Sequence, residues 1–204
     1  MNNTIKDLKT GDIILFTPGK SGIFHYIDKI IPIASHSSYS HIGMILKNPS
    51  FIHPSLKGLY VWQSGWEGRE DVNDGKVKVG VQITPLKEVL EDYKDHKVII
   101  RKINCNPLLF SNSKLSKVNE VVYDKPYDIL PQDWFQALMK TDYDPQKTNR
   151  FWCSALVGYI YAYCGIIDCN TNWSILTPGD FSICSENLNF EKNCFLEKEE
   201  IQIN

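Results

Sequence analysis

The chain of 204 residues lacks the long hydrophobic run that a membrane-spanning helix needs. Such a helix takes roughly 18 or more consecutive apolar residues, and the densest apolar run, residues 155–164, is much shorter. The first eight residues also lack the apolar core of a signal peptide. The sequence therefore predicts no transmembrane segment and no secretory leader, and we expect a cytoplasmic protein.

An excess of charge of one sign is missing too. Lysine and arginine number 22 and aspartate and glutamate 24, which gives a formal net charge of −2. Because nucleic-acid-binding domains usually carry a basic face, we expect no nucleic-acid partner. The six cysteines are too few for a disulfide scaffold, and none forms the Cys-x-x-Cys pair common in zinc sites. We expect reduced thiols, one of them reactive, and neither a metal nor a cofactor.

Two familiar catalytic motifs are incomplete or absent. Gly19-Lys20-Ser21 resembles the end of a phosphate-binding P-loop, but position 14, where that loop needs its first glycine, is Ile14. No Gly-x-Ser-x-Gly sequence is present, which argues against a serine hydrolase of the α/β type. A nucleotide site and a serine nucleophile are therefore both disfavoured.

What the chain does contain is a substantial apolar fraction, 43%, enough for one globular domain over residues 1–204. Short apolar or alternating runs predict strands in the first half, and helical periodicity dominates the second. This order favours an α+β fold over alternating βαβ units. We expect strands at 11–16, 41–46, 59–63, 77–83 and 98–103, helices at 23–31, from about 113, at 131–140 and at 149–164, a surface loop or hairpin at 66–76, and a peripheral tail after 187.

Cys153 is expected near the start of a buried helix. The residues that follow it are apolar nearly all round, Thr148 and Asn149 are candidate N-caps, and Gly165 ends the apolar run. Unpaired N–H groups at a helix start favour a thiolate, which lowers the pKa of a cysteine there. On this basis Cys153 is a candidate nucleophile, although a small buried core cysteine is the alternative from its position alone.

His41 opens a predicted strand and precedes Gly43 by two residues. A glycine in a strand lets another chain segment approach closely. A histidine at a rigid strand end, facing a helix start, can act as general base for a thiol. The alternative is a histidine that only satisfies hydrogen bonds at the strand end.

Six short motifs in order resemble a known family. They are Gly-Asp-Ile-Ile-Leu-Phe (11–16), Tyr-Ser-His-Ile-Gly (39–43), Val-Trp-Gln-Ser (61–64), Lys-Pro-Tyr-Asp (125–128), Trp-Cys-Ser-Ala-Leu-Val (152–157) and Leu-Thr-Pro-Gly-Asp-Phe (176–181). Together they resemble the circularly permuted branch of the NlpC-type papain-like superfamily, the YiiX-like group, with members in bacteria and large DNA viruses. As in that branch, the histidine precedes the cysteine along the chain.

The resemblance implies a permuted papain-like fold, in which a small antiparallel sheet or open barrel packs against a buried helix that carries the nucleophile. It implies Cys153 as nucleophile, His41 as base and Gln63 as the orienting third residue, where many relatives have glutamate. Gln63 can accept the imidazole N–H but cannot stabilise imidazolium with a full charge. Tyr127 and Asp128 match a family motif that is best interpreted as a structural turn.

The leading functional hypothesis is a cysteine-dependent hydrolase or acyltransferase, of peptidase or amidase type. Cys153 would form a thioester with an amide, ester or thioester substrate, either a peptide or a lipid acyl group. The first alternative is a catalytically idle binding protein that retains the cleft. The second is an interaction module whose contact surface includes Trp62 and Trp66.

Overall fold

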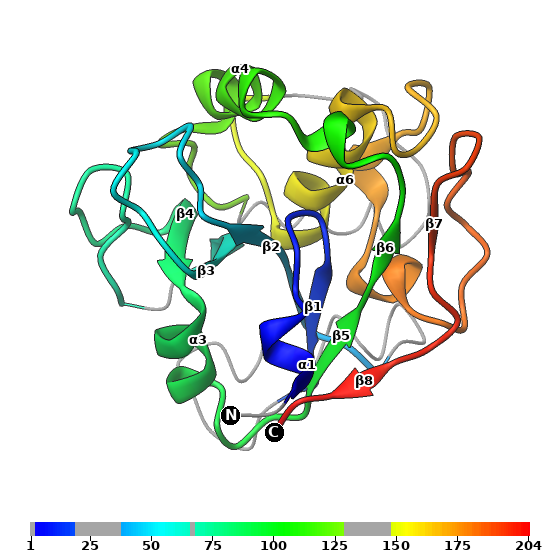
Figure 1. The fold of residues 1–204 in the computed structure, drawn as a ribbon, viewed down its shortest axis with the longest axis horizontal. Helices are drawn as coiled ribbons and strands as arrows, with labels where there is room; N and C mark the ends of the chain where they lie inside the picture. Colours follow the sequence, from blue (N-terminus) through cyan, green and yellow to red (C-terminus); the bar gives the residue numbers. More distant parts are fainter. Residues whose placement is uncertain (1–2, 19–37, 66–67, 129–147) are drawn as a thin grey trace.

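The computed structural model describes residues 3–18, 38–65, 68–128 and 148–204 (Figure 1). The helices expected at 23–31 and 131–140, the Gly19-Lys20-Ser21 turn and Trp66 lie outside these ranges. The described part is α+β, as the sequence predicted. No helix in it is long and apolar enough to cross a membrane.

An antiparallel sheet of six strands forms the centre, in the order β4-β3-β2-β1-β5-β8, and each neighbouring pair is antiparallel. A separate pair joins β6 to β7. The strands are β1 (Ile13–Phe16), β2 (His41–Lys47), β3 (Leu59–Gly65), β4 (Gly80–Pro85), β5 (Val98–Arg101), β6 (Ile103–Asn104), β7 (Phe195–Leu196) and β8 (Ile201–Gln202).

The helices lie on both faces of this sheet (Figure 1). Apolar residues that alternate along the strands divide into two buried clusters, because successive side chains of a strand point to opposite faces. Met44 and Trp62 belong to the cluster with α6, and Ile45 and Val61 to the cluster with α3. The helical elements are α1 (Asn3–Lys6), α3 (Leu86–Asp92), α4 (Asn112–Val122), α6 (Cys153–Cys164) and the 3-10 turns η1 (Pro107–Phe110), η2 (Trp173–Ile175) and η3 (Pro178–Phe181).

The strand expected at 77–83 starts later than the alternation indicated. Val77 and Val79 are 56% and 46% exposed, and β4 begins only at Gly80. Gly80 has a φ of 145°, and a Cβ there would overlap the carbonyl oxygen of Lys125. The chain therefore enters the sheet at a position that requires glycine, and the alternation upstream belongs to a loop.

The tail after residue 187 is not peripheral, so that prediction was wrong. It contributes β7 and β8, and Leu188, Cys194, Leu196 and Ile203 are buried. Polar residues dominate this segment, but its few apolar side chains alternate toward the core.

Helix α3 was also missed, although Leu86, Val89 and Leu90 have helical spacing directly after Pro85. Trp62 is fully buried, which excludes it as a surface contact.

Candidate active site

Strands β2 and β3 bring His41 and Gln63 together. Their register pairs Gly43 with Gln63, so His41 lies two residues along β2 on the same face. The His41 Nε2 to Gln63 Oε1 distance is 2.9 Å. Because a carboxamide oxygen only accepts, this hydrogen bond assigns the ring proton to Nε2. Nδ1 is then the basic nitrogen of the ring.

Gly43 is needed for this arrangement. A Cβ at position 43 would lie 2.5 Å from Val61 Cγ1 and 3.3 Å from the Trp62 carbonyl oxygen. The sequence analysis expected a close approach at this glycine, and the neighbour that makes it is strand β3. A side chain at 43 would point to the same face as His41 and Gln63, with its Cβ 3.4 Å from the Gln63 Cβ.

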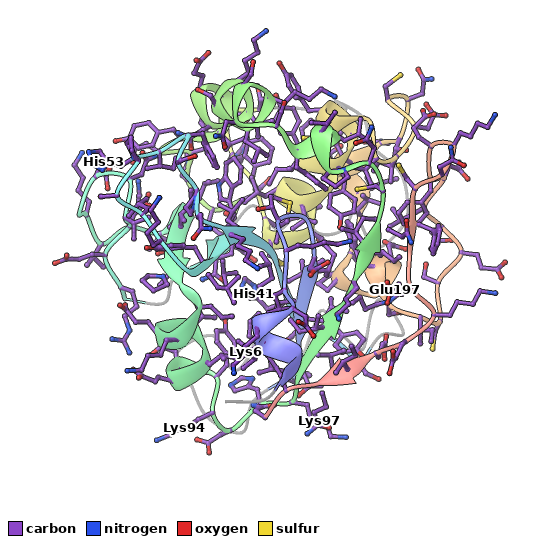
Figure 2. All side chains as sticks on the ribbon, in the orientation of Figure 1. Lys6, His41, His53, Lys94, Lys97 and Glu197 are labelled. Carbon is purple, nitrogen blue, oxygen red and sulfur yellow. The ribbon has the colours of Figure 1, made fainter. Side chains whose placement is uncertain are left out.

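The His41 imidazole is buried in an aromatic environment. It is only 7% exposed, its ring centroid lies 5.4 Å from that of Phe16, and it stacks on Tyr93 at 5.8 Å. Burial lowers the pKa of His41 to about 4, against a smaller opposing effect of the Gln63 hydrogen bond. Figure 2 shows His41 inside the molecule and His53 at its rim. The neutral imidazole is therefore the resting form at neutral pH.

Cys153 is the first residue of α6, as expected for a candidate nucleophile, but Trp152 and not Thr148 or Asn149 is the N-cap. The backbone N–H of Ile42, the residue directly after His41, acts on the Cys153 sulfur and favours the thiolate. Backbone N–H groups of a strand lie close to the plane of the sheet. Ile42 faces the α6 side of the sheet together with Cys153. His41 and Gln63 alternate with it and lie on the α3 side, so Cys153 approaches the end of β2 from the opposite face.

The expected direction of the Cys153 pKa shift was wrong. The thiol is 2% exposed, and burial raises its pKa to about 11. The backbone N–H groups of Ile42, Ser154 and Cys153 itself act in the opposite direction and offset only part of this effect. Helix-start donors stabilise a thiolate, but removal from water costs it more when no charged partner compensates.

The segment before Cys153 is held through Phe151. Its carbonyl oxygen accepts from Ser64 Oγ at 2.6 Å and from the Asp128 N–H at 3.3 Å, and its N–H donates to the Pro126 carbonyl at 3.1 Å. Tyr127 pairs with Phe151 as an isolated parallel bridge. The Lys-Pro-Tyr-Asp motif therefore has a structural role, because it fixes the chain that leads into α6.

The Leu-Thr-Pro-Gly-Asp-Phe motif holds the first turns of α6 from the other side. Ser154 Oγ donates to the Leu176 carbonyl at 2.6 Å, and Thr177 and Asp180 form a capping box that starts η3. Gly158 allows the approach, since a Cβ there would lie 2.6 Å from Leu176 Cδ1. Ser154 was not singled out from the sequence, where its position beside Cys153 was the available signal.

The Gly-Asp-Ile-Ile-Leu-Phe motif is structural as well. The Asp12 carboxylate, fully buried, accepts from the backbone N–H groups of Lys9 at 2.9 Å and Ile103 at 3.1 Å. Burial raises its pKa. Tyr161 of α6 donates its hydroxyl to the Gly11 carbonyl at 2.6 Å. These contacts tie the start of β1 to the core and to α6.

Two buried polar groups near the site, Gln63 Nε2 and Trp152 Nε1, find no hydrogen-bond partner among the residues that the structure describes. Each is a donor that has lost its water, which is costly unless an acceptor arrives. Trp152 directly precedes Cys153. A cavity of about 460 Å³ lies elsewhere and is lined by residues 68–77 together with Pro85 and Glu88.

Among the described residues, no three or more His, Cys, Asp or Glu side chains converge in a way that could hold a metal ion. At the site itself the donors are one imidazole, one thiol and one carboxamide, and Nε2 of the imidazole is already bonded to Gln63. This set does not form a metal-binding shell of the usual kind.

Comparison with known proteins supports the fold. No family model matches the chain, and no curated protein matches it. A solved structure that is similar is YiiX from Escherichia coli O157:H7, described as a metalloprotein and assigned to DUF1105. The TM-score is 0.50 at 24% sequence identity, over 76% of this chain and 66% of YiiX. The α+β architecture with its antiparallel sheet is thus compatible with a YiiX-like fold.

Proposed function

We propose that the protein is a cysteine-dependent hydrolase or acyltransferase built as one permuted papain-like domain over residues 1–204. Cys153 is the nucleophile, His41 the base and Gln63 the residue that orients His41. One observation carries the proposal: Gln63 on β3 holds the His41 imidazole at 2.9 Å, and the N–H of the next residue, Ile42, acts on the Cys153 sulfur. In this proposal, Cys153 and the pair formed by His41 and Gln63 act together across the end of β2, where the two faces of the sheet meet.

The protonation states favour general-base catalysis over a preformed ion pair. With a pKa of about 11 for Cys153 and about 4 for His41, thiol and imidazole are both neutral at pH 7. The thiol proton passes to Nδ1 of His41 as the sulfur attacks the acyl carbon. A sulfur–carbon bond forms, and the leaving amine, alcohol or thiol takes the proton from Nδ1. Water or an acceptor nucleophile then cleaves the thioester.

The donors around Cys153 suit the oxyanion that this attack creates. The backbone N–H of Cys153 is one donor at the helix start. The second candidate is Trp152 Nε1–H, which is buried and finds no acceptor in the described part of the chain. A carbonyl oxygen that becomes negatively charged would satisfy this group, and its interaction would be strongest in the transition state.

The substrate class follows from this chemistry. A thiol nucleophile with a neutral imidazole base suits an amide, ester or thioester, carried by a peptide or a lipid. The described residues do not fit the metal implied by the description of YiiX, so no step depends on one.

Trapping of the acyl-enzyme tests the proposal. The protein is incubated with a panel of aryl esters, acyl thioesters and aminoacyl amides, and the acylated peptide is located by mass spectrometry. We expect an acyl group on Cys153, lost in Cys153→Ala and strongly reduced in His41→Ala. The matched control is Cys164→Ala, which removes the buried cysteine at the other end of α6. Acylation confined to the exposed Cys169 or Cys184 would refute the proposal.

A second candidate is a catalytically idle protein that binds acyl compounds at the same place. The raised pKa of Cys153 and the neutral Gln63 favour it. Calorimetric titration with a non-hydrolysable acyl amide distinguishes the two. Idle binding predicts equal affinity in wild type and Cys153→Ala, together with no turnover of any compound in the panel.

A further inference from the structure

Two cysteines outside the proposed site lie next to the paired strands β6 and β7: Cys105 directly follows β6, and Cys194 directly precedes β7. The register of this pair joins Ile103 to Leu196 and Asn104 to Phe195. Continued by one residue, the same register places Cys105 opposite Cys194. Both thiols are free, Cys105 half-buried and Cys194 buried. Residues directly opposite in an antiparallel pair have side chains on the same face.

The hydrogen-bond pattern determines which kind of pair this is. Glu197 N–H donates to the Lys102 carbonyl at 2.8 Å, so Lys102 and Glu197 form a hydrogen-bonded pair of the ladder. Types alternate along an antiparallel ladder. Counting three positions onward makes Cys105 and Cys194 a non-hydrogen-bonded pair. In agreement, the Cys194 N–H donates to the Glu191 carbonyl at 2.9 Å and not across the ladder.

That position suits a disulfide. Residues opposite each other at non-hydrogen-bonded positions have Cα atoms about 4.5 Å apart. Disulfides span Cα separations of roughly 4.4–6.8 Å. Burial raises the pKa of Cys105, and Cys194 adds an electrostatic effect in the same direction, which is consistent with their proximity. The pair therefore needs little backbone movement to close.

We propose that Cys105 and Cys194 form a redox-active dithiol, which a small-molecule disulfide of the glutathione class oxidises to a cross-strand disulfide. The Cys105 thiolate attacks the reagent disulfide, forms a mixed disulfide and releases one reagent thiolate. The Cys194 thiolate then attacks the Cys105 sulfur and releases the second. Two protein thiols are oxidised, the reagent disulfide is reduced to two thiols, and the two protein protons go to the released thiolates or to buffer.

The disulfide would fasten the C-terminal segment to the rest of the fold. This segment is otherwise held by the β8 pairing with β5 and by the buried Arg101, whose Nη2 donates to the Glu197 carbonyl at 2.7 Å. The closed loop would contain about 90 residues, and a cross-link across a long loop removes conformational freedom from the unfolded chain.

A competing partner for Cys105 is present. Burial raises the pKa of Cys164, the last residue of α6, and Cys105 adds a smaller electrostatic effect in the same direction. Cys164 lies on a helix and not opposite Cys105 in a ladder, so the strand register favours Cys194. The experiment therefore has to separate these two pairings.

The experiment treats the folded protein with oxidised glutathione at pH 8.5, in a Cys169→Ser/Cys184→Ser background that removes the exposed thiols. Trypsin then releases Cys105 in peptide 103–114 and Cys194 in peptide 193–198, whereas Cys164 stays in peptide 151–192. We expect the first two peptides to be joined, with the loss of two hydrogen atoms. The oxidised protein should melt about 5–15 °C higher than the reduced one, and dithiothreitol should reverse the shift.

Three variants make the result decisive. Cys105→Ser and Cys194→Ser should each abolish both the joined peptides and the melting shift, while Cys164→Ser should keep both. Joining of peptide 103–114 to peptide 151–192 would overturn the proposal, as would oxidation that stops at glutathione adducts. These outcomes do not depend on the chemistry of Cys153, which can be measured separately in the same samples.

Discussion

Helix α6 begins and ends with a buried cysteine, but the groups that act on the pKa of the thiol differ between the two ends. At the start, the backbone N–H of Ile42 and N–H groups of the first turn act on Cys153 against the effect of burial. At the end, the ammonium of Lys114, bonded to the Cys164 carbonyl at 2.9 Å, supplies the charge that opposes the effect of burial on Cys164. Burial raises the pKa of Cys153 to about 11 and that of Cys164 to about 12.

The comparison shows that a helix start alone does not make a reactive thiolate. The N–H donors leave the pKa of Cys153 below that of Cys164 but do not bring it near neutrality. The first end also differs in its neighbour, because Ile42, whose N–H acts on Cys153, directly follows His41, the base that we propose. Four predictions test this difference.

The largest expected difference is in acyl turnover. Cys153→Ala should lower turnover of any accepted substrate by at least about 10³-fold, because it removes the nucleophile. Cys164→Ala should change it by less than about 3-fold and act mainly on stability. Initial rates on one aryl ester or thioester, with circular dichroism to check folding, measure both. Comparable losses in the two variants would contradict a special role for the first end.

Acid should destabilise the fold through His41. Its pKa is about 4 in the folded protein against 6.5 for the free side chain, so the unfolded chain binds the extra proton first. Stability contributed by the neutral buried ring is complete above pH 6.5 and is lost as the pH falls toward 4. The loss amounts to about 3 kcal/mol at 1.36 kcal/mol per pKa unit.

Urea unfolding between pH 7 and pH 4 measures this loss. His41→Asn should flatten the pH dependence, while His53→Asn, at an exposed position, should leave it as in wild type. If the free energy of unfolding of His41→Asn falls with pH as steeply as that of the wild type, other groups cause the loss of stability in acid.

Variants of Gln63 test whether this residue, on the neighbouring strand β3, orients the His41 ring. Gln63→Leu removes the acceptor of the Nε2 proton, and we expect turnover to fall by about 10-fold while the fold persists. Gln63→Glu should be tolerated or raise activity, because a carboxylate stabilises imidazolium. It should also raise the pKa read from the acid limb of the rate profile. Equal rates in all three proteins would reduce Gln63 to an ordinary strand residue.

The smallest expected difference between the two ends of α6 is in the alkylation rates of Cys153 and Cys164. At pH 10 the difference between pKa values of about 11 and about 12 gives Cys153 roughly ten times the thiolate fraction of Cys164. Iodoacetamide labelling with peptide mapping follows both, and the exposed Cys169 and Cys184 should react first. Faster labelling of Cys153 than of these two near neutral pH would show that it is more exposed or more acidic than its surroundings in the structure imply.

The amino-acid sequence by itself determined the elements with strong periodicity and the ends fixed by local chemistry. Strands β2 and β3, helix α4 and the end of α6 at Gly165, with its φ of 75°, follow the predictions. The reason is that alternation, helical spacing and a left-handed cap are properties of a few adjacent residues. The resemblance directed attention to His41, Gln63 and Cys153, and the hydrogen bond between the first two is present.

Only the tertiary structure decided the rest, because each remaining feature depends on residues far apart in the chain. The C-terminal tail became part of the fold because β5 offers an edge to β8 and Arg101 binds its carbonyls. The pKa of Cys153 rose because residues from the sheet and from the segments around Phe151 and Leu176 exclude water from the helix start. A local pattern identifies a candidate nucleophile, but its charge state is set by the solvent exposure that packing leaves.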